Sequence, residues 1–251
     1  MEKIAENVHI LSGKEYGTNI GLISVQGGMI LIDPMPGEQS LSDLAAVITA
    51  ISGDTKKYIL NTHAHSDHTG GNQYFIERGA RLIEQELGVH EITYIKVSSH
   101  TAADVIFYHK TSNTLFVGDV FDNHWHPTFY AGGIQGFKQA IDTILSVANE
   151  QTVIVPGHGQ TANKAVLLEF KRNTLAWVNK ITELHHKGLS IDSIMADAEV
   201  QAALEKFNTN KRTSFIPDKA LRRFIERTIA VVASERATEQ ANSQVKPSTS
   251  I

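Results

Sequence analysis

The fold of this chain is decided by the stretch Asn61-Thr62-His63-Ala64-His65-Ser66-Asp67-His68-Thr69-Gly70-Gly71-Asn72. It places three imidazoles and one carboxylate within six residues, directly after the apolar segment Tyr58-Ile59-Leu60. Neutral imidazole and carboxylate are preferred ligands of Zn²⁺ and related divalent ions. A solvated loop has no physical reason to gather four such side chains behind a buried strand, so the stretch predicts a metal site.

The pattern His-x-His-x-Asp-His resembles the signature of the metallo-β-lactamase-fold hydrolases, and this resemblance implies three further ligands downstream, each at one end of an apolar strand. His100 precedes the apolar run 104–108, and Asp119 closes Leu115-Phe116-Val117-Gly118-Asp119. His158 lies in the turn of Val153-Ile154-Val155-Pro156-Gly157-His158-Gly159. Each of these segments alone is weak evidence for the family. Found in this order after the first cluster, the three together are specific evidence for it.

With these three residues in place, the resemblance extends over residues 8–160. The resemblance implies two divalent metal ions that share seven ligands. His63, His65 and His100 would hold the first ion, Asp67, His68 and His158 the second, and Asp119 would bridge both. Zn²⁺ is the preferred ion, and nitrogen and oxygen ligands also accept Fe or Mn.

The resemblance implies a dinuclear metal-dependent hydrolase. Two ions about 3.5–4 Å apart can hold a bridging hydroxide at neutral pH, which would attack a lactam, lactone, ester or thioester carbonyl. Asp67 would also orient this hydroxide. The leaving group would take its proton from a metal-bound water or from Asp119. The chain has no cysteine and no Gly-x-Ser-x-Gly elbow, so covalent Cys catalysis is excluded and a Ser triad is unsupported.

The loop after Asp119 is expected to border the site, with Asn123, His124 and His126 as candidate substrate contacts. Asp122 stands where broad-spectrum β-lactamases have a Lys and quorum-quenching lactonases a Tyr, and it would repel a carboxylate. Asp119 likewise replaces the Cys of those β-lactamases. The diffuse overall likeness is to hydrolases found with sulfur-oxidation and quinoprotein gene clusters.

Two alternatives stay open within the resemblance. A glyoxalase II-like thioesterase shares the ligands and a helical C-terminal part, although no clear basic cluster for glutathione is found. An iron-dependent persulfide dioxygenase-like redox enzyme is permitted in part by the ligand set, although no flavin domain follows. A metal-binding scaffold without catalysis is a third reading, disfavoured because all seven ligands are present.

The composition limits the kinds of molecule that the chain is expected to bind. The chain has 251 residues and a net charge of −4, and without a basic patch it predicts a small-molecule substrate and no nucleic acid. No apolar stretch approaches the roughly 20 residues of a membrane span. The sequence as it stands indicates a cytoplasmic protein, or a periplasmic one if a signal peptide was removed. It is expected to be a monomer or a homodimer.

Strands and helices alternate, which favours an α/β fold and, by the resemblance, an αββα four-layer sandwich with a helical C-terminal extension. Residues 1–237 are expected to form a single domain that becomes helical from about 162, and 238–251 a loose polar tail. Strands are predicted at 8–11, 19–25, 29–32, 58–61, 81–84, 91–97, 104–109, 114–118 and 152–155. Helices are predicted at 38–52, 72–78, 134–148, 163–187, 191–195, 202–207 and 221–232.

Overall fold

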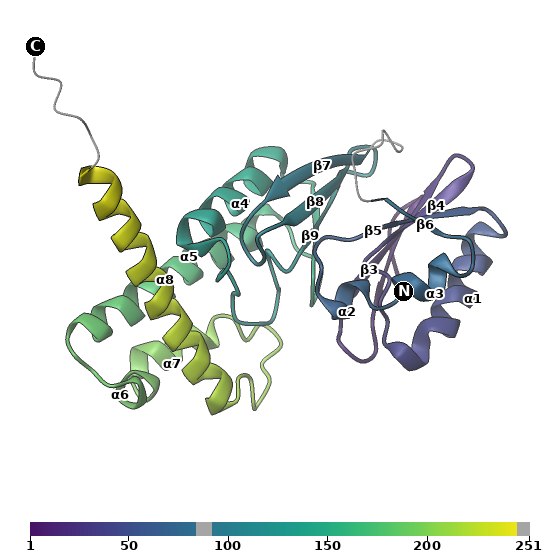
Figure 1. Ribbon diagram of the computed structural model, residues 1–251. Helices are drawn as coiled ribbons and strands as arrows, with labels where there is room; N and C mark the ends of the chain where they lie inside the picture. The colour runs from purple at the N-terminus through teal and green to yellow at the C-terminus, as the bar shows by residue number, and fades with distance from the viewer. Residues whose placement is uncertain (84–91, 245–251) are drawn as a thin grey trace, which may run out of the picture.

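Two β-sheets form the centre of the protein in the computed structural model, which describes residues 1–83 and 92–244 (Figure 1). The first sheet has the strand order β1-β2-β3-β4-β5-β6 and the second β10-β9-β8-β7. The first contains β1 (Glu2–Ala5), β2 (Val8–Ser12), β3 (Asn19–Val25), β4 (Gly28–Ile32), β5 (Lys56–Leu60) and β6 (Arg81–Leu82). The second contains β7 (Ile92–Val97), β8 (Asp104–His109), β9 (Thr114–Gly118) and β10 (Val153–Pro156).

Helices cover the outer faces of both sheets (Figure 1). Over the first sheet lie α1 (Leu41–Ser52), preceded by the 3₁₀ turn η1 (Glu38–Ser40), and α3 (Asn72–Ile76). Over the second lie α4 (Gly133–Val147) and α5 (Lys164–His186). Beyond them come α6 (Ile191–Met195), α7 (Ala198–Glu205) and α8 (Asp218–Gln244), while the short α2 (Ser66–Thr69) lies inside the metal-ligand stretch.

The side chains of β4 point alternately to its two faces, and this explains how the helix and sheet layers pack. Met29 and Leu31 pack with Leu44 of α1 on one face. Ile30 and its neighbours on the other face pack with Phe116 of β9, between the sheets. Successive strand side chains point to opposite faces, so a fully apolar strand must be covered on both sides. The predicted αββα sandwich is confirmed.

The C-terminal helices belong to the largest hydrophobic cluster of the described residues. Val117 of β9, Ile141 of α4, Trp177 of α5 and Ile225 of α8 all lie in it, each at most 1% exposed. The helical part from about residue 162 is therefore a cover for the second sheet. No helix within 1–83 and 92–244 has the length and hydropathy to cross a bilayer.

Several boundaries differ from those predicted. Strand β1 was not predicted, and α7 begins at Ala198 because the Asp197 side chain accepts hydrogen bonds from the Glu199 and Val200 amides. The polar tail predicted from residue 238 is wrong as far as Gln244, since 233–244 lack Gly and Pro and continue α8. Residues 245–251, and the strand ends predicted at 84 and 91, lie outside the described residues.

Strand ends bring the predicted ligands to one edge. Parallel β9 and β10 end there and antiparallel β8 begins there, so Asp119, His158 and His100 meet. The first sheet joins this edge where the Val105 amide donates to the Thr62 carbonyl at 2.7 Å. The Asn19 side-chain amide donates to the Pro156 carbonyl at 3.0 Å. Both sheets therefore contribute side chains to a single site.

Candidate metal centre

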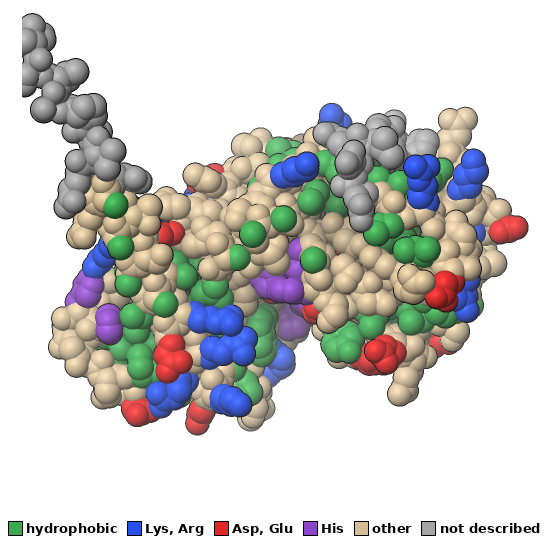
Figure 2. All heavy atoms as spheres, in the orientation of Figure 1, with side chains coloured by type: hydrophobic (Ala, Val, Ile, Leu, Met, Phe, Trp, Pro, Cys, Tyr) green, Lys and Arg blue, Asp and Glu red, His purple; other side chains and the backbone are tan. Residues whose placement is uncertain are grey.

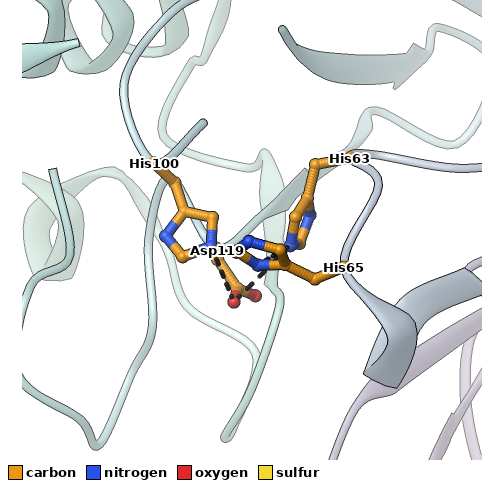
Figure 3. A group of neighbouring side chains, drawn as sticks. All are labelled: His63, His65, His100 and Asp119. Atoms are coloured by element: carbon orange, nitrogen blue, oxygen red, sulfur yellow. Dashed lines mark hydrogen bonds and ion pairs between the residues drawn. The ribbon is translucent and has the colours of Figure 1, made fainter. Parts of the chain in front are cut away.

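His63, His65, His100 and Asp119 form the first group of candidate ligands, and their side chains converge from three loops (Figure 3). His65 Nδ1 lies 3.1 Å from His63 Nε2 and 2.9 Å from His100 Nε2. Asp119 Oδ2 lies 3.4 Å from His100 Nε2 and 3.8 Å from His63 Nε2. The four atoms thus surround one point.

Asp67, His68, His158 and again Asp119 form the second group. Asp119 Oδ1 lies 3.1 Å from His68 Nε2 and 3.5 Å from His158 Nε2. Asp67 Oδ2 lies 3.3 Å from His158 Nε2 and 3.8 Å from His68 Nε2. Asp119 therefore presents one carboxylate oxygen to each group.

These distances fit a cation at the centre of each group. Four ligand atoms with bonds of about 2.0–2.1 Å to a tetrahedral ion stand about 3.3 Å from one another. Moreover, His68 Nε2 and Asp119 Oδ1 are buried 3.1 Å from each other, and neither has a further hydrogen-bond partner among the described residues. A cation held between the ligand atoms would satisfy both of them.

His68 is oriented by a carboxylate behind it. Asp33, 2% exposed, lies with Oδ2 2.9 Å from His68 Nδ1, and accepts hydrogen bonds from the Thr62 amide and hydroxyl at 2.8 and 2.6 Å. When Nδ1–H donates to Asp33, the Nε2 lone pair is directed at the second group. A carboxylate behind a ligating His is the usual way in which proteins fix the ring and its tautomer.

The rings of His100 and His158 are also held at Nδ1, by a hydroxyl group and a backbone carbonyl. His100 Nδ1 lies 2.6 Å from the Thr128 hydroxyl, and His158 Nδ1 donates to the Tyr16 carbonyl at 3.0 Å. Both rings thereby direct Nε2 into the site. His65 differs, because its Nδ1 faces the group.

The pKa values of His63 in the first group and His68 in the second are shifted in opposite directions. Burial lowers the pKa of His63 to about 4, so this ring is a neutral, ligation-ready imidazole. Burial opposes the charge on His68 as well, but hydrogen bonds to Asp119 and Asp33 raise its pKa to about 11. Burial disfavours ionisation of Asp119, yet the hydrogen bond and charge of His68 lower the pKa of this carboxyl. The centre contains a carboxylate ready to accept a cation.

A cavity of about 380 Å³ opens over the centre. Asp67, Asp119 and His158 line it, as does His124, one of the three predicted substrate contacts. Asn123 is not among the lining residues, since its side-chain amide donates to the Gln160 carbonyl at 2.8 Å and ties down the loop. His124 and Asn123 stay predictions as substrate contacts.

The prediction for His126 is wrong. This residue is 0% exposed, stacks on Phe224 with ring centroids 4.1 Å apart, and meets Trp177 edge-on at 4.7 Å. Its Nδ1–H donates to the Pro127 carbonyl at 2.8 Å. The sequence places it near Asp119, but the chain turns inward at this point and buries the ring in the helical core.

Burial of His126 predicts an acid-labile core. Burial lowers its folded-state pKa to about 3, below the ordinary 6.5, so the unfolded chain takes up the proton first. Stability is lost as pH falls below 6.5, and this residue should contribute a loss of about 2 kcal/mol between pH 7 and pH 5. His126→Asn keeps a donor and removes the titration. Urea unfolding of chelator-treated protein at both pH values should show that much less pH dependence than the parent.

The control for that measurement is His185→Asn, on the exposed surface of α5. It should keep the pH dependence of the parent chain. An equal pH dependence in the His126 variant and the parent would contradict the assignment.

Asp122 differs from its expected role of repelling a substrate carboxylate. Its side chain is buried, with the residue 5% exposed, and Oδ1 accepts a hydrogen bond from the His158 amide at 3.1 Å. Burial and the nearby charge of Asp119 raise the pKa of Asp122. It shapes the His158 turn and also lines the cavity over the centre, and its raised pKa weakens the negative charge that was expected to repel a substrate carboxylate.

Sequence reasoning missed Asp33, Thr128 and Tyr16. Asp33 had a usable signal, because a carboxylate ends the apolar strand 28–32 and precedes Pro34. Its backbone φ of 50° also lies in the left-handed region that non-glycine residues seldom adopt. Tyr16 acts through its backbone carbonyl, which leaves no side-chain signature.

Comparisons with known proteins agree with this geometry. Residues 13–80 match the sequence model of the Metallo-beta-lactamase superfamily. A hydroxyacylglutathione hydrolase of Prochlorococcus marinus is 30% identical over 162 residues, which cover 55% of this chain and 65% of the relative. A probable hydroxyacylglutathione hydrolase of Schizosaccharomyces pombe is 29% identical over 123 residues, 41% of this chain and 48% of the relative. The chain thus spans about half to two thirds of these relatives.

A solved structure supports the fold over a longer range. The DIM-1 metallo-beta-lactamase superposes with a TM-score of 0.56 at 20% identity, over 68% of this chain and 94% of that chain. The His and Asp groups on such a fold imply that the centre takes divalent metal ions. Segment 13–80, which contains four of the seven candidate ligands, is similar to sequences of the Metallo-beta-lactamase superfamily, and the sandwich around it has the fold of the solved metallo-beta-lactamase.

Proposed function

We propose that this chain is a dinuclear metal-dependent hydrolase of a carbonyl compound, with a thioester as the favoured substrate. The observation that carries the proposal is Asp119, whose two oxygens face two separate groups of ligands. A single structural metal would need one group only. The seven ligands proposed are His63, His65, Asp67, His68, His100, Asp119 and His158, and Zn²⁺ is the preferred ion.

The residues have distinct tasks in this proposal. When bound, two divalent ions would supply a hydroxide near neutral pH and polarise the substrate carbonyl. Asp67 stands at the open side, its side chain 31% exposed, and orients the attacking oxygen. Its backbone is held by the Thr18 hydroxyl, which donates to the Asp67 carbonyl at 2.7 Å. Asp67 and Asp119 are the candidates to carry the proton to the leaving group.

Among carbonyl substrates, the curated relatives favour the thioester, because both are named hydroxyacylglutathione hydrolases. Residues 1–237 are proposed to act as one domain, since α8 lines the space beside the metal centre. Lactones, esters and lactams are the other carbonyl substrates to be tested.

The test is turnover by metal-reconstituted full-length chain. We expect about two metal equivalents per chain by elemental analysis, and hydrolysis of acyl thioesters faster than of lactams such as nitrocefin. Chelation should abolish turnover and Zn²⁺ should restore it. Oxygen consumption with glutathione persulfide, in place of hydrolysis, would replace this proposal with the iron-dependent redox function.

A further inference from the structure

A second cavity, of about 810 Å³, lies directly beside the metal centre. His65 and His100 stand in its wall. It shares His100, Trp125 and Thr128 with the smaller cavity over Asp67 and Asp119, so the two form one continuous groove. A groove of this size suits a ligand much longer than the reacting group itself.

The far wall of this groove is basic. It is formed by α8, which contributes Arg223 and Arg227 one turn apart on the same helix face. The Arg227 guanidinium carbon lies 5.3 Å from the centroid of the Tyr130 ring, which is also in the wall. Figure 2 shows Lys and Arg side chains gathered beside the histidines where this face is hollowed.

These two charges are uncompensated within the described part of the chain. The neighbouring Arg222 pairs with Asp192 and lies 4.0 Å from Glu226. No ion pair is formed by Arg223 or Arg227 among the described residues, and both are exposed. The large cavity has no acidic residue in its described lining. Guanidinium groups without a carboxylate partner are suited to bind carboxylate or phosphate.

A third arginine extends the basic surface to the smaller cavity. Arg212 lies in its lining, donates to the His124 carbonyl at 2.9 Å and stands 5.3 Å from the centroid of the Trp125 ring. Trp125, Tyr130 and Phe224 add aromatic side chains to the lining that also contains His65, His100 and the two α8 arginines. The groove therefore combines candidate metal ligands, apolar surface and cationic groups.

We infer that the groove selects acyl substrates that carry an anion, a carboxylate or a phosphate, on the part remote from the scissile carbonyl. Arg223 and Arg227 bind this anion while the carbonyl lies at the metal centre. The inference rests on the proposed function and adds the substrate class. The arginines are specificity-determining residues that act on binding.

Matched substrates test the inference on metal-loaded full-length chain. S-acetyl-4′-phosphopantetheine and S-acetylpantetheine differ only in the phosphate, and S-acetylglutathione and its diethyl ester differ in two carboxylates. The parent should prefer at least one anionic member, mainly through a lower KM. In the double variant R223Q/R227Q, the ratio of kcat/KM for the anionic to the neutral member should fall about 10- to 100-fold. The pair that responds identifies the anion.

The control is R222Q, which removes an adjacent α8 arginine that pairs with acidic residues, and it should keep the parental ratio. A parental ratio near one in both pairs, or the same ratio in the double variant, would overturn the inference.

Absence of turnover with all four compounds would contradict the proposed function alone. Quenching of Trp125 fluorescence then decides the inference, because the other tryptophan, Trp177, is 0% exposed. 4′-Phosphopantetheine or glutathione should quench at lower concentration than its uncharged counterpart, and R223Q/R227Q should remove the difference. Equal quenching by charged and uncharged ligands would reject the basic groove as an anion site.

Discussion

Asp119→Asn is expected to leave a folded protein with fewer than two metal equivalents and with turnover reduced on the order of 10³-fold, beyond the 10–100-fold typical of residues behind the ligands. Each oxygen of Asp119 faces one of the two groups. An amide offers one oxygen and one NH₂ group, and the NH₂ group is no ligand. Only one group can then be completed. Elemental analysis and thioester hydrolysis on the same preparation measure both effects.

The matched control is Asp142→Asn on α4, where the carboxylate pairs with Lys171 at the surface. It should keep the metal content and turnover of the parent chain. Near-UV circular dichroism should be unchanged in both variants. Two metal equivalents and parental turnover in the Asp119 variant would exclude the bridging role.

Gly157→Ala is expected to disrupt the centre although it replaces none of the seven candidate ligands. A methyl group at residue 157 would overlap Asp119 Oδ1 and would lie 2.8 Å from the Gly118 carbonyl carbon and 2.9 Å from the Asp119 amide nitrogen. Backbone cannot give way cheaply, so Asp119 must move from between the two groups. We expect a loss of about 1–3 kcal/mol in the free energy of unfolding. We also expect turnover to fall by at least about 100-fold, the upper end for supporting residues.

Gly188→Ala separates this effect from the general cost of adding a methyl group. Gly188 has a φ of 78° and open space at the Cβ position, so its variant should lose about 1 kcal/mol through backbone strain alone. Metal content should not change. Chemical unfolding and elemental analysis of the two alanine variants provide the comparison, and full metal occupancy in Gly157→Ala would refute the steric argument.

The candidate ligands could be recognised in the sequence because each carries a local signal. His63 follows an apolar strand in a stretch too rich in imidazole for a loop, and Asp119 and His158 each close a strand. Strand alternation and parallel pairing then bring such ends to one edge, as β9 and β10 do. These are properties of a few adjacent residues, which periodicity can capture.

What lies around the ligands was less predictable, because it depends on how distant segments pack. His126 and Asp122 follow Asp119 closely, yet both turn inward and are buried. Arg223 and Arg227 read as polar positions of a covering helix, and no basic cluster was found in the sequence. Only the packing of α8 against the second sheet brings them to the groove. The inferred substrate class therefore depends on tertiary contacts that a linear pattern does not contain.

The candidate ligands come from loops of both sheets, and this has a mechanical consequence. His63, His65, Asp67 and His68 follow β5 of the first sheet, while His100, Asp119 and His158 flank strands of the second. Bound ions would cross-link the halves of a chain that has no cysteine to do so. Such a link closes long loops and stabilises the native chain in proportion to the logarithm of free metal concentration. Withdrawal of metal would weaken the contact between the two sheets, so that metal supply would set the lifetime of the folded protein as well as its proposed activity.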